Sequence, residues 1–176
     1  MREFAHYSFR RIFKQSIVYG VALGSFLEIM NILDYTLGFQ EQSQVVNNAK
    51  YMIRIFGLLL CIIIFRKRSG GYISFEEAFV FSLFTFVFAM FTCDTMVCIT
   101  FNLYPELLHG KIEAMKEALM NAGVSRRLVK LSANYALWEK NPYYVILSFV
   151  IWTLFAGPIL SFIFALMMQK NKASTN

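Results

Sequence analysis

Charged residues are scarce in this chain of 176 residues: they make up 16% of it, whereas hydrophobic residues make up 57%. A soluble domain carries roughly a quarter charged residues. One soluble core of this length cannot bury so much apolar material, so the composition indicates a single integral membrane domain, residues 1–176. The net charge of +6 does not indicate nucleic-acid binding, because the cations cluster beside apolar runs, as membrane orientation signals do.

Histidine and cysteine are also rare. The two histidines, His6 and His109, lie far apart in the chain, on opposite sides of the membrane in the topology predicted below. Cys61, Cys93 and Cys98 all lie in apolar runs, and on one helix Cys93 and Cys98 are too far apart for a disulfide, so we interpret them as small apolar residues. The patterns H-E-x-x-H, G-x-S-x-G and G-x-x-x-x-G-K-[ST] are absent. We therefore expect no catalytic residue, no cofactor, no metal site and no enzymatic activity.

What the sequence does contain is long apolar runs. About 20 apolar residues cross a bilayer, and the runs predict four spans, at about 16–37, 48–65, 77–104 and 143–168. The second is the weakest, because Arg54 interrupts it. The first has a basic flank like that of a signal peptide, but no A-x-A-like site follows, so we expect it to be retained. The predicted fold is all-α: an integral membrane four-helix bundle with a short amphipathic helical hairpin between spans three and four.

Basic residues predict the orientation. One set of flanks carries most of the Lys and Arg, and cytoplasmic loops have this excess. Both termini and the loop between spans two and three should therefore be cytoplasmic, and aromatic residues gather at the opposite ends of the spans. The basic flanking residues are Arg2, Arg10, Arg11, Lys14, Arg66, Lys67, Arg68, Lys170 and Lys172.

The stretch FRKRSGGYISFEEAF, residues 65–79, has glycines and charges that resemble a phosphate-binding loop, but it lacks the required lysine pattern. Ser74 followed by Glu77 predicts a capping box at the start of span three. Gly70 and Gly71 allow the chain to reverse. We interpret the stretch as a turn.

The segment 105–141 is the only sizeable part outside the predicted spans. Leu108, Ile112, Met115 and Leu119 recur at helical spacing, Gly123 interrupts them, and a second apolar stripe follows. Two short helices should lie on the outer membrane surface or fold over the mouth of the bundle. They are either a structural cap or a docking surface for an extracytoplasmic partner. Asn141 and Pro142 then predict an N-cap and a first-turn proline for the last span.

Three stretches carry a family resemblance: GGYISFEEAF before a span, KEALMNAGVSRRLVKLSANYALWEKNP, and the closing run that ends in MMQKNK. In this order they resemble the domain-of-unknown-function family 4199 (DUF4199), small four-span inner-membrane proteins of Bacteroidota. Glu76 stands where that family typically has a small residue. The resemblance implies an inner-membrane location and assigns no activity.

Polar residues inside the predicted spans are the candidate functional residues. A charged carboxylate near the bilayer centre costs about 2.5–3.5 kcal/mol on insertion scales, so each needs a reason. In one hypothesis Arg54 pairs with Asp34 or Asp94, while Glu28 is protonated and hydrogen-bonded. In the other, Glu28 and Asp94 form a proton or cation site in a polar cavity. The candidates are Glu28, Asn31, Asp34, Arg54 and Asp94.

Small residues recur every four positions in spans one and four, which predicts close helix packing. Gly20 and Gly24 precede Glu28 in span one, and Gly157 and Ser161 lie in span four, where Pro158 should bend the helix. These faces should contact the bundle interior or a partner.

Two functions follow from these patterns. The chain is either a non-catalytic accessory or scaffold subunit for another envelope protein, or a small oligomeric transporter or ion pathway that uses Glu28 and Asp94. We favour the accessory role, because the chain shows no internal repeat of the kind many transporters have. Its expected partners are the lipid bilayer and a membrane protein or further copies of itself.

Overall fold

The computed structural model describes the backbone of residues 2–37 and 44–168, and their side chains except those of 2–8, 34–35, 37 and 44–51. The all-α prediction is confirmed there. The elements are α1 Arg2–Leu37, α2 Gln44–Arg68, α3 Phe75–Leu103, α4 Pro105–Asn121, α5 Arg126–Leu137, the 3₁₀ turn η2 Trp138–Lys140, α6 Pro142–Ile151, the π-helical turn η3 Trp152–Ala156 and α7 Gly157–Met168.

Three stretches in the described residues are long and apolar enough to cross a membrane: Phe9–Leu33, Phe75–Leu103 and Pro142–Met168. They match three of the four predicted spans. The remaining span, 48–65, falls within the unbroken helix α2, and its crossing stays a prediction.

The first span differs from its predicted start at residue 16. The apolar stretch begins at Phe9 and its helix already at Arg2. Arg10, Arg11 and Lys14 therefore lie on the helix and not in a flanking loop. The physical reason is that no proline or glycine occurs before Gly20, so nothing ends the helix where the charges begin.

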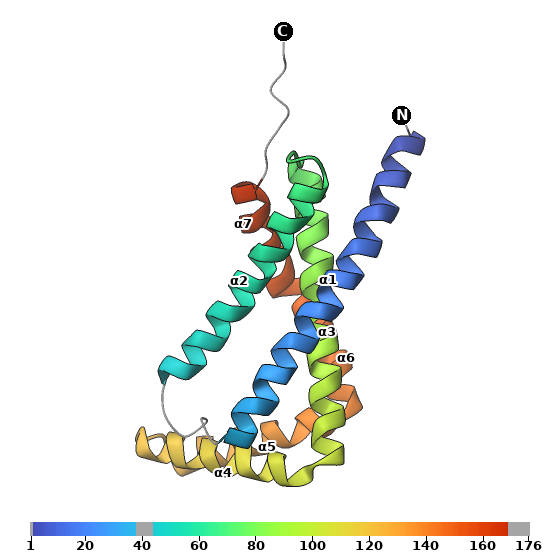
Figure 1. Cartoon of the computed structure of the whole chain (residues 1–176). Coiled ribbons are helices and arrows are strands. Elements are labelled where there is room, and N and C mark those ends of the chain that lie inside the picture. The colour runs from blue at the N-terminus through green and yellow to red at the C-terminus, as the bar shows by residue number, and fades with distance from the viewer. Residues whose placement is uncertain (1, 38–43, 169–176) are drawn as a thin grey trace.

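α3 is the central helix of the bundle. α1 crosses it along much of its length, α6 and α7 pack on it from another side, and α2 contacts it near the turn between them (Figure 1). One apolar core lies near that turn and includes Ile62, Phe65 and Phe81; a second lies near α4 and includes Leu27 and Phe101. Contacts on several sides explain why α3 buries residues all round.

The turn between α2 and α3 follows the sequence prediction. Gly70 and Gly71 both have positive φ, at 81° and 84°. The capping box is confirmed: the Glu77 amide donates to Ser74 Oγ at 3.2 Å, and the Ser74 amide donates to Glu77 Oε2 at 3.1 Å. We call this end of the bundle the turn end. The start of α1 and the end of α7 lie there too (Figure 1).

The last span is one apolar stretch with a π-helical turn in its middle. The Gly157 amide donates to the Trp152 carbonyl, five residues back, one residue before Pro158. A proline has no amide to donate and its ring clashes with the carbonyl four residues earlier, so a widened turn relieves the strain that Pro158 creates. The Asn141 N-cap is also confirmed, with its Oδ1 accepting from the Tyr143 amide at 3.0 Å.

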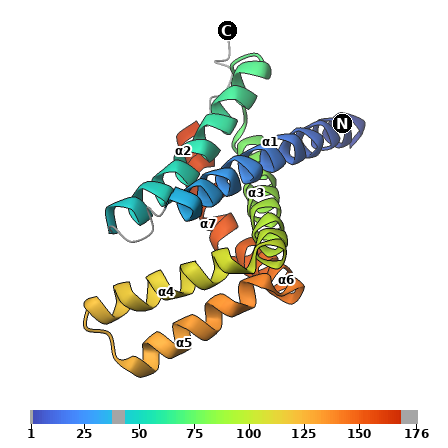
Figure 2. The same cartoon turned by 60° about the horizontal axis from the view of Figure 1, so that its bottom comes forward.

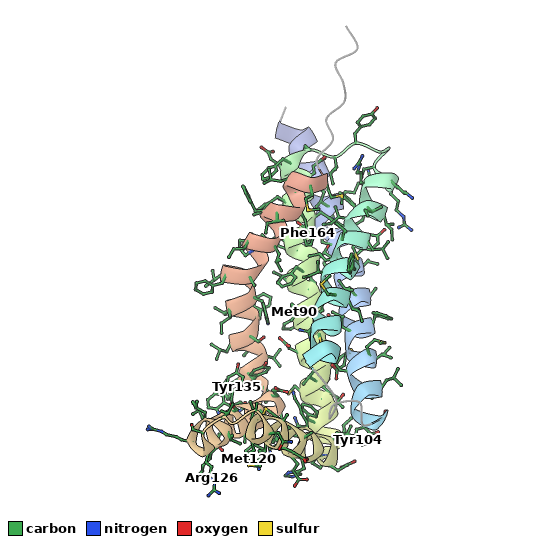
Figure 3. The ribbon with its side chains drawn as sticks, turned by 90° about the vertical axis from the view of Figure 1, so that its left-hand side faces the viewer. Met90, Tyr104, Met120, Arg126, Tyr135 and Phe164 are labelled. Atoms are coloured by element: carbon green, nitrogen blue, oxygen red, sulfur yellow. The ribbon has the colours of Figure 1, made fainter. Side chains whose placement is uncertain are left out.

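α4 and α5 form the predicted hairpin, with Gly123 at its tip in a positive-φ conformation, 74°. The two helices run side by side and lead away from the base of the bundle (Figure 2). We call this end the hairpin end. The hairpin lies across the direction of the spans, with Met120 and Arg126 on its far side and Tyr135 on the side of the spans (Figure 3).

Candidate functional site

The glycines of α1 bring it into close contact with α3. A Cβ placed on Gly20 would lie 2.5 Å from Phe88 Cβ, and one on Gly24 would lie 2.3 Å from the Ala89 carbonyl oxygen. Ser16 lies four residues before Gly20, and Glu28 lies four residues after Gly24, so all four share one face of α1. The side chains of Ser16 and Glu28 are fully buried. This close contact places the Glu28 side chain directly against α3.

α7 meets α3 through small residues as well. A Cβ on Gly157 would lie 3.1 Å from Leu83 Cδ1 and 2.7 Å from the Trp152 carbonyl oxygen. Ser161 is fully buried, and its carbonyl accepts from Ser82 Oγ at 3.5 Å. Gly157 and Ser161 therefore lie in the bundle interior.

Glu28 sits in a small polar cluster between α1 and α3. Its Oε2 accepts from Asn31 Nδ2 at 3.1 Å and from the Cys93 thiol at 3.8 Å. Its Oε1 is buried without a hydrogen-bond partner among the described residues. Sequence reasoning treated Cys93 as apolar filler, whereas its thiol here is a weak donor to a buried carboxyl.

Asp94, the next residue after Cys93, points to another side of α3. Its Oδ2 accepts a hydrogen bond from Ser148 Oγ of α6, and both residues are buried. Successive residues on a helix are about 100° apart, which explains why Cys93 faces Glu28 of α1 while Asp94 faces Ser148 of α6. The two carboxyls thus do not form one shared site.

A further set of polar contacts lies one turn nearer the hairpin end. Asn102 Nδ2 donates to the Lys140 carbonyl at 2.7 Å and to the Cys98 carbonyl at 2.8 Å. The Cys98 thiol donates to the same Lys140 carbonyl at 3.3 Å. These contacts fix the start of the last span, where the chain leaves η2, against α3.

Arg54 and Asp34 are the remaining two predicted residues. Arg54 is half-buried on α2. The backbone of Asp34 belongs to α1, but its side chain lies outside the described residues. The expected ion pair of Arg54 with Asp34 or Asp94 stays a prediction. Lys170 and Lys172, two of the orientation signals, also lie outside the described residues.

An ion pair joins the two halves of the hairpin near its base. Lys111 Nζ on α4 pairs with Glu139 Oε2 on η2, and both side chains are partly buried. The same ammonium lies 5.4 Å from the centre of the Phe101 ring on α3. Leu108, Ile112, Ala133 and Ala136 pack beside Phe101. The hairpin is therefore fastened to the bundle by both apolar and ionic contacts.

A groove of about 480 Å³ runs between α4 and α5. Met120 and Arg126, which line it, lie on the side of the hairpin away from the spans (Figure 3). The lining mixes cations with apolar side chains and includes no carboxylate; it consists of His109, Ile112, Lys116, Met120, Arg126, Val129, Lys130, Ala133, Asn134 and Leu137.

The sequence predicted a docking surface on these two helices as one of two alternatives but did not predict this groove. The signal that the sequence offered was the clustering of Arg126, Arg127 and Lys130 on a helix with no acidic residue. Chemically, the groove can bind an anionic group together with apolar atoms. Within the described residues, no group of His, Cys, Asp and Glu side chains is placed to hold a metal ion.

Three apolar helices of spanning length and an external hairpin define the class: a multi-pass helical membrane protein. The chain belongs to the family described as protein of unknown function (DUF4199), whose model matches residues 18–170. No curated protein and no solved structure matches the chain.

Proposed function

We propose that the chain is a four-span protein of the bacterial inner membrane, with both termini in the cytoplasm. α2 supports the fourth span: its 25 residues at about 1.5 Å each exceed a hydrocarbon core of about 30 Å. Arg66, Lys67 and Arg68 end α2 at the turn end. Basic residues favour the cytoplasmic side, so the hairpin end faces outward.

Its proposed role is that of a non-catalytic accessory or scaffold subunit for another envelope protein. The observation that carries this proposal is the groove between α4 and α5 at the hairpin end of the bundle. Two cations reach it from α5, Arg126 and Lys130, and Lys116 and His109 reach it from α4. The partner that fits is an extracytoplasmic protein segment with acidic and apolar side chains, because opposite charges give docking its specificity.

The surroundings of Glu28 and Asp94 favour a structural role for both. Glu28 accepts a hydrogen bond from the Cys93 thiol of α3, and Asp94 accepts one from the Ser148 hydroxyl of α6. A buried polar group with a hydrogen-bond partner stabilises the helix contact in which it lies. An ion that displaced the hydrogen-bond donor would remove this stabilisation. Carboxyls that face different sides of one helix provide no common pathway.

The second candidate is a small oligomeric transporter or ion pathway. The observation that favours it is Glu28 Oε1, which is buried without a partner among the described residues. In this alternative Glu28 would exchange a proton or cation, and Asp94 would contribute from a separate position.

Two measurements separate the two candidates. A tagged chain is cross-linked in native membranes, purified and analysed by mass spectrometry, alongside a Glu28→Gln, Asp94→Asn variant. The accessory role predicts one stoichiometric envelope partner, recovered equally with the variant. Recovery of only self-linked species would contradict it, and proton or cation flux into vesicles that the variant abolishes would establish the transporter.

A further inference from the structure

α5 has an exposed apolar face that points toward the spans. Leu128, Leu131 and Tyr135 follow one another at helical spacing and are 53%, 65% and 62% exposed. Tyr135 lies on the side of the hairpin nearer the spans (Figure 3) and meets Tyr144 of α6 edge-on, with ring centroids 6.2 Å apart. This apolar face of α5 therefore lies on the same side of the hairpin as the spans, and the groove lies on the opposite side.

The surface of the last span continues this face. Tyr143, Ile146 and Leu147 of α6 are 73%, 60% and 51% exposed, on a stretch apolar enough to cross a membrane. Lipid is the solvent of such a surface. At the corner where α5 meets α6, the ring contact between Tyr135 and Tyr144 joins the two apolar surfaces.

The charged residues of α5 are of the kind found at a membrane interface. The helix carries Arg126, Arg127 and Lys130 and no carboxylate. Arg127 lies one helical turn from Leu131, beside the apolar face. Helices that lie in a membrane interface combine an apolar face with Lys and Arg, whose long side chains reach the headgroup phosphates.

From these three observations we infer that α5 is an in-plane interfacial helix. Its Leu128–Leu131–Tyr135 face enters the outer leaflet between the headgroups and the acyl chains, and Arg127 contacts anionic lipid phosphates. The hairpin thus binds lipid on one side and presents the groove to the aqueous side on the other. The inference does not depend on what the groove binds.

Spin labelling of the full chain in vesicles of phosphatidylglycerol and phosphatidylethanolamine tests this. A nitroxide introduced by Leu131→Cys should collide readily with oxygen and poorly with a water-soluble nickel chelate. Its matched control, Arg126→Cys, is exposed on the groove side of the same helix and should show the reverse. The unsubstituted chain gives the background from the three buried cysteines. Both positions are exposed, so neither label disturbs the core.

Two results would overturn the inference. A Leu131 label as accessible to the nickel chelate as the Arg126 label would place the face in water. A Leu131 label shielded from both reagents would place it against protein, either a partner or a second copy. For the headgroup contact, Arg127→Glu should make the Leu131 label several-fold more accessible to nickel in these vesicles and leave it unchanged in phosphatidylcholine; equal effects in both lipids would rule out the contact with anionic phosphate.

Discussion

Gly24 and Ala89 hold α1 and α3 at a distance that leaves no room for a side chain. A Cβ on Gly24 would lie 2.3 Å from the Ala89 carbonyl oxygen and 2.8 Å from Thr92 Cβ. The nearest obstacle is backbone, which cannot rotate away as a side chain could. The contact lies just before Glu28 in the sequence, so the spacing of these helices also fixes the polar cluster around Glu28.

Replacing Gly24 by alanine should destabilise the protein. Adding atoms to a packed contact costs about 1–3 kcal/mol, which here exceeds the helix-propensity gain of alanine. The measurement is unfolding of the purified chain in detergent micelles, followed by circular dichroism.

The matched control for this variant is Gly110→Ala. Gly110 lies in α4, and a Cβ there would meet nothing within 4 Å. Alanine should stabilise the helix at this position by about 0.5–1 kcal/mol. If both variants shift the unfolding free energy in the same direction, the α1–α3 contact is not as close as described.

The Asp94–Ser148 hydrogen bond should contribute to stability in a way that does not need a charge. Asp94→Asn keeps an acceptor oxygen for the Ser148 hydroxyl and should leave stability close to that of the original chain. Asp94→Ala leaves the buried hydroxyl without its acceptor and should cost about 1–3 kcal/mol. The same micelle unfolding assay measures both, with Ser148→Ala as a second way of removing the bond. An asparagine variant as unstable as the alanine variant would refute this interpretation.

The cysteines should react slowly in the folded protein. Cys61, Cys93 and Cys98 are all buried, with Cys93 2% exposed beside Glu28. Maleimide treatment of native membranes, read by mass spectrometry, should modify few of them, and treatment after SDS denaturation should modify all. Rapid labelling of Cys93 in native membranes would mean that water reaches Glu28, which would favour the ion pathway over the accessory role.

The topology predicts opposite labelling at the two ends of the bundle. Tyr72 is exposed in the turn between α2 and α3, and Asn121 is exposed at the end of α4. In intact spheroplasts an impermeant thiol reagent should label Asn121→Cys and spare Tyr72→Cys, and detergent should expose both. Labelling of both positions before lysis would mean that α2 does not complete its crossing.

The features that the sequence predicted correctly are local ones. The Ser74–Glu77 capping box, the Gly70–Gly71 turn and the Asn141 N-cap each depend on residues within a few positions of one another. Spans one, three and four were recognisable because an apolar run of that length has few other uses. The helix α1 extends further toward the N-terminus than the span predicted from residue 16, because no proline or glycine precedes Gly20.

The contacts that depend on packing were not predictable. No local sequence pattern indicates that Asp94 accepts a hydrogen bond from Ser148, which is far along the chain. The same is true of the hydrogen bond from the Cys93 thiol to Glu28. The groove needs two helices side by side, and its basic lining exists only once Lys116 of α4 and Lys130 of α5 line the same space. The sequence did not indicate whether the hairpin covers the bundle or extends over the membrane surface. In the structure the base of the hairpin packs on Phe101, and its tip leads away from the bundle (Figure 2).

The central claim, that the groove docks an acidic segment of an envelope protein, is tested most directly by site-specific photo-cross-linking in native membranes. A photoreactive residue at Asn134, in the groove, should capture one protein partner, and the same residue at Leu128, on the apolar face of α5 away from the groove, should capture lipid. Adding Lys116→Glu and Lys130→Glu should abolish the protein adduct at Asn134 without changing the amount of the chain in the membrane. A protein adduct at Asn134 that survives this charge reversal, or no adduct there at all, would contradict the account.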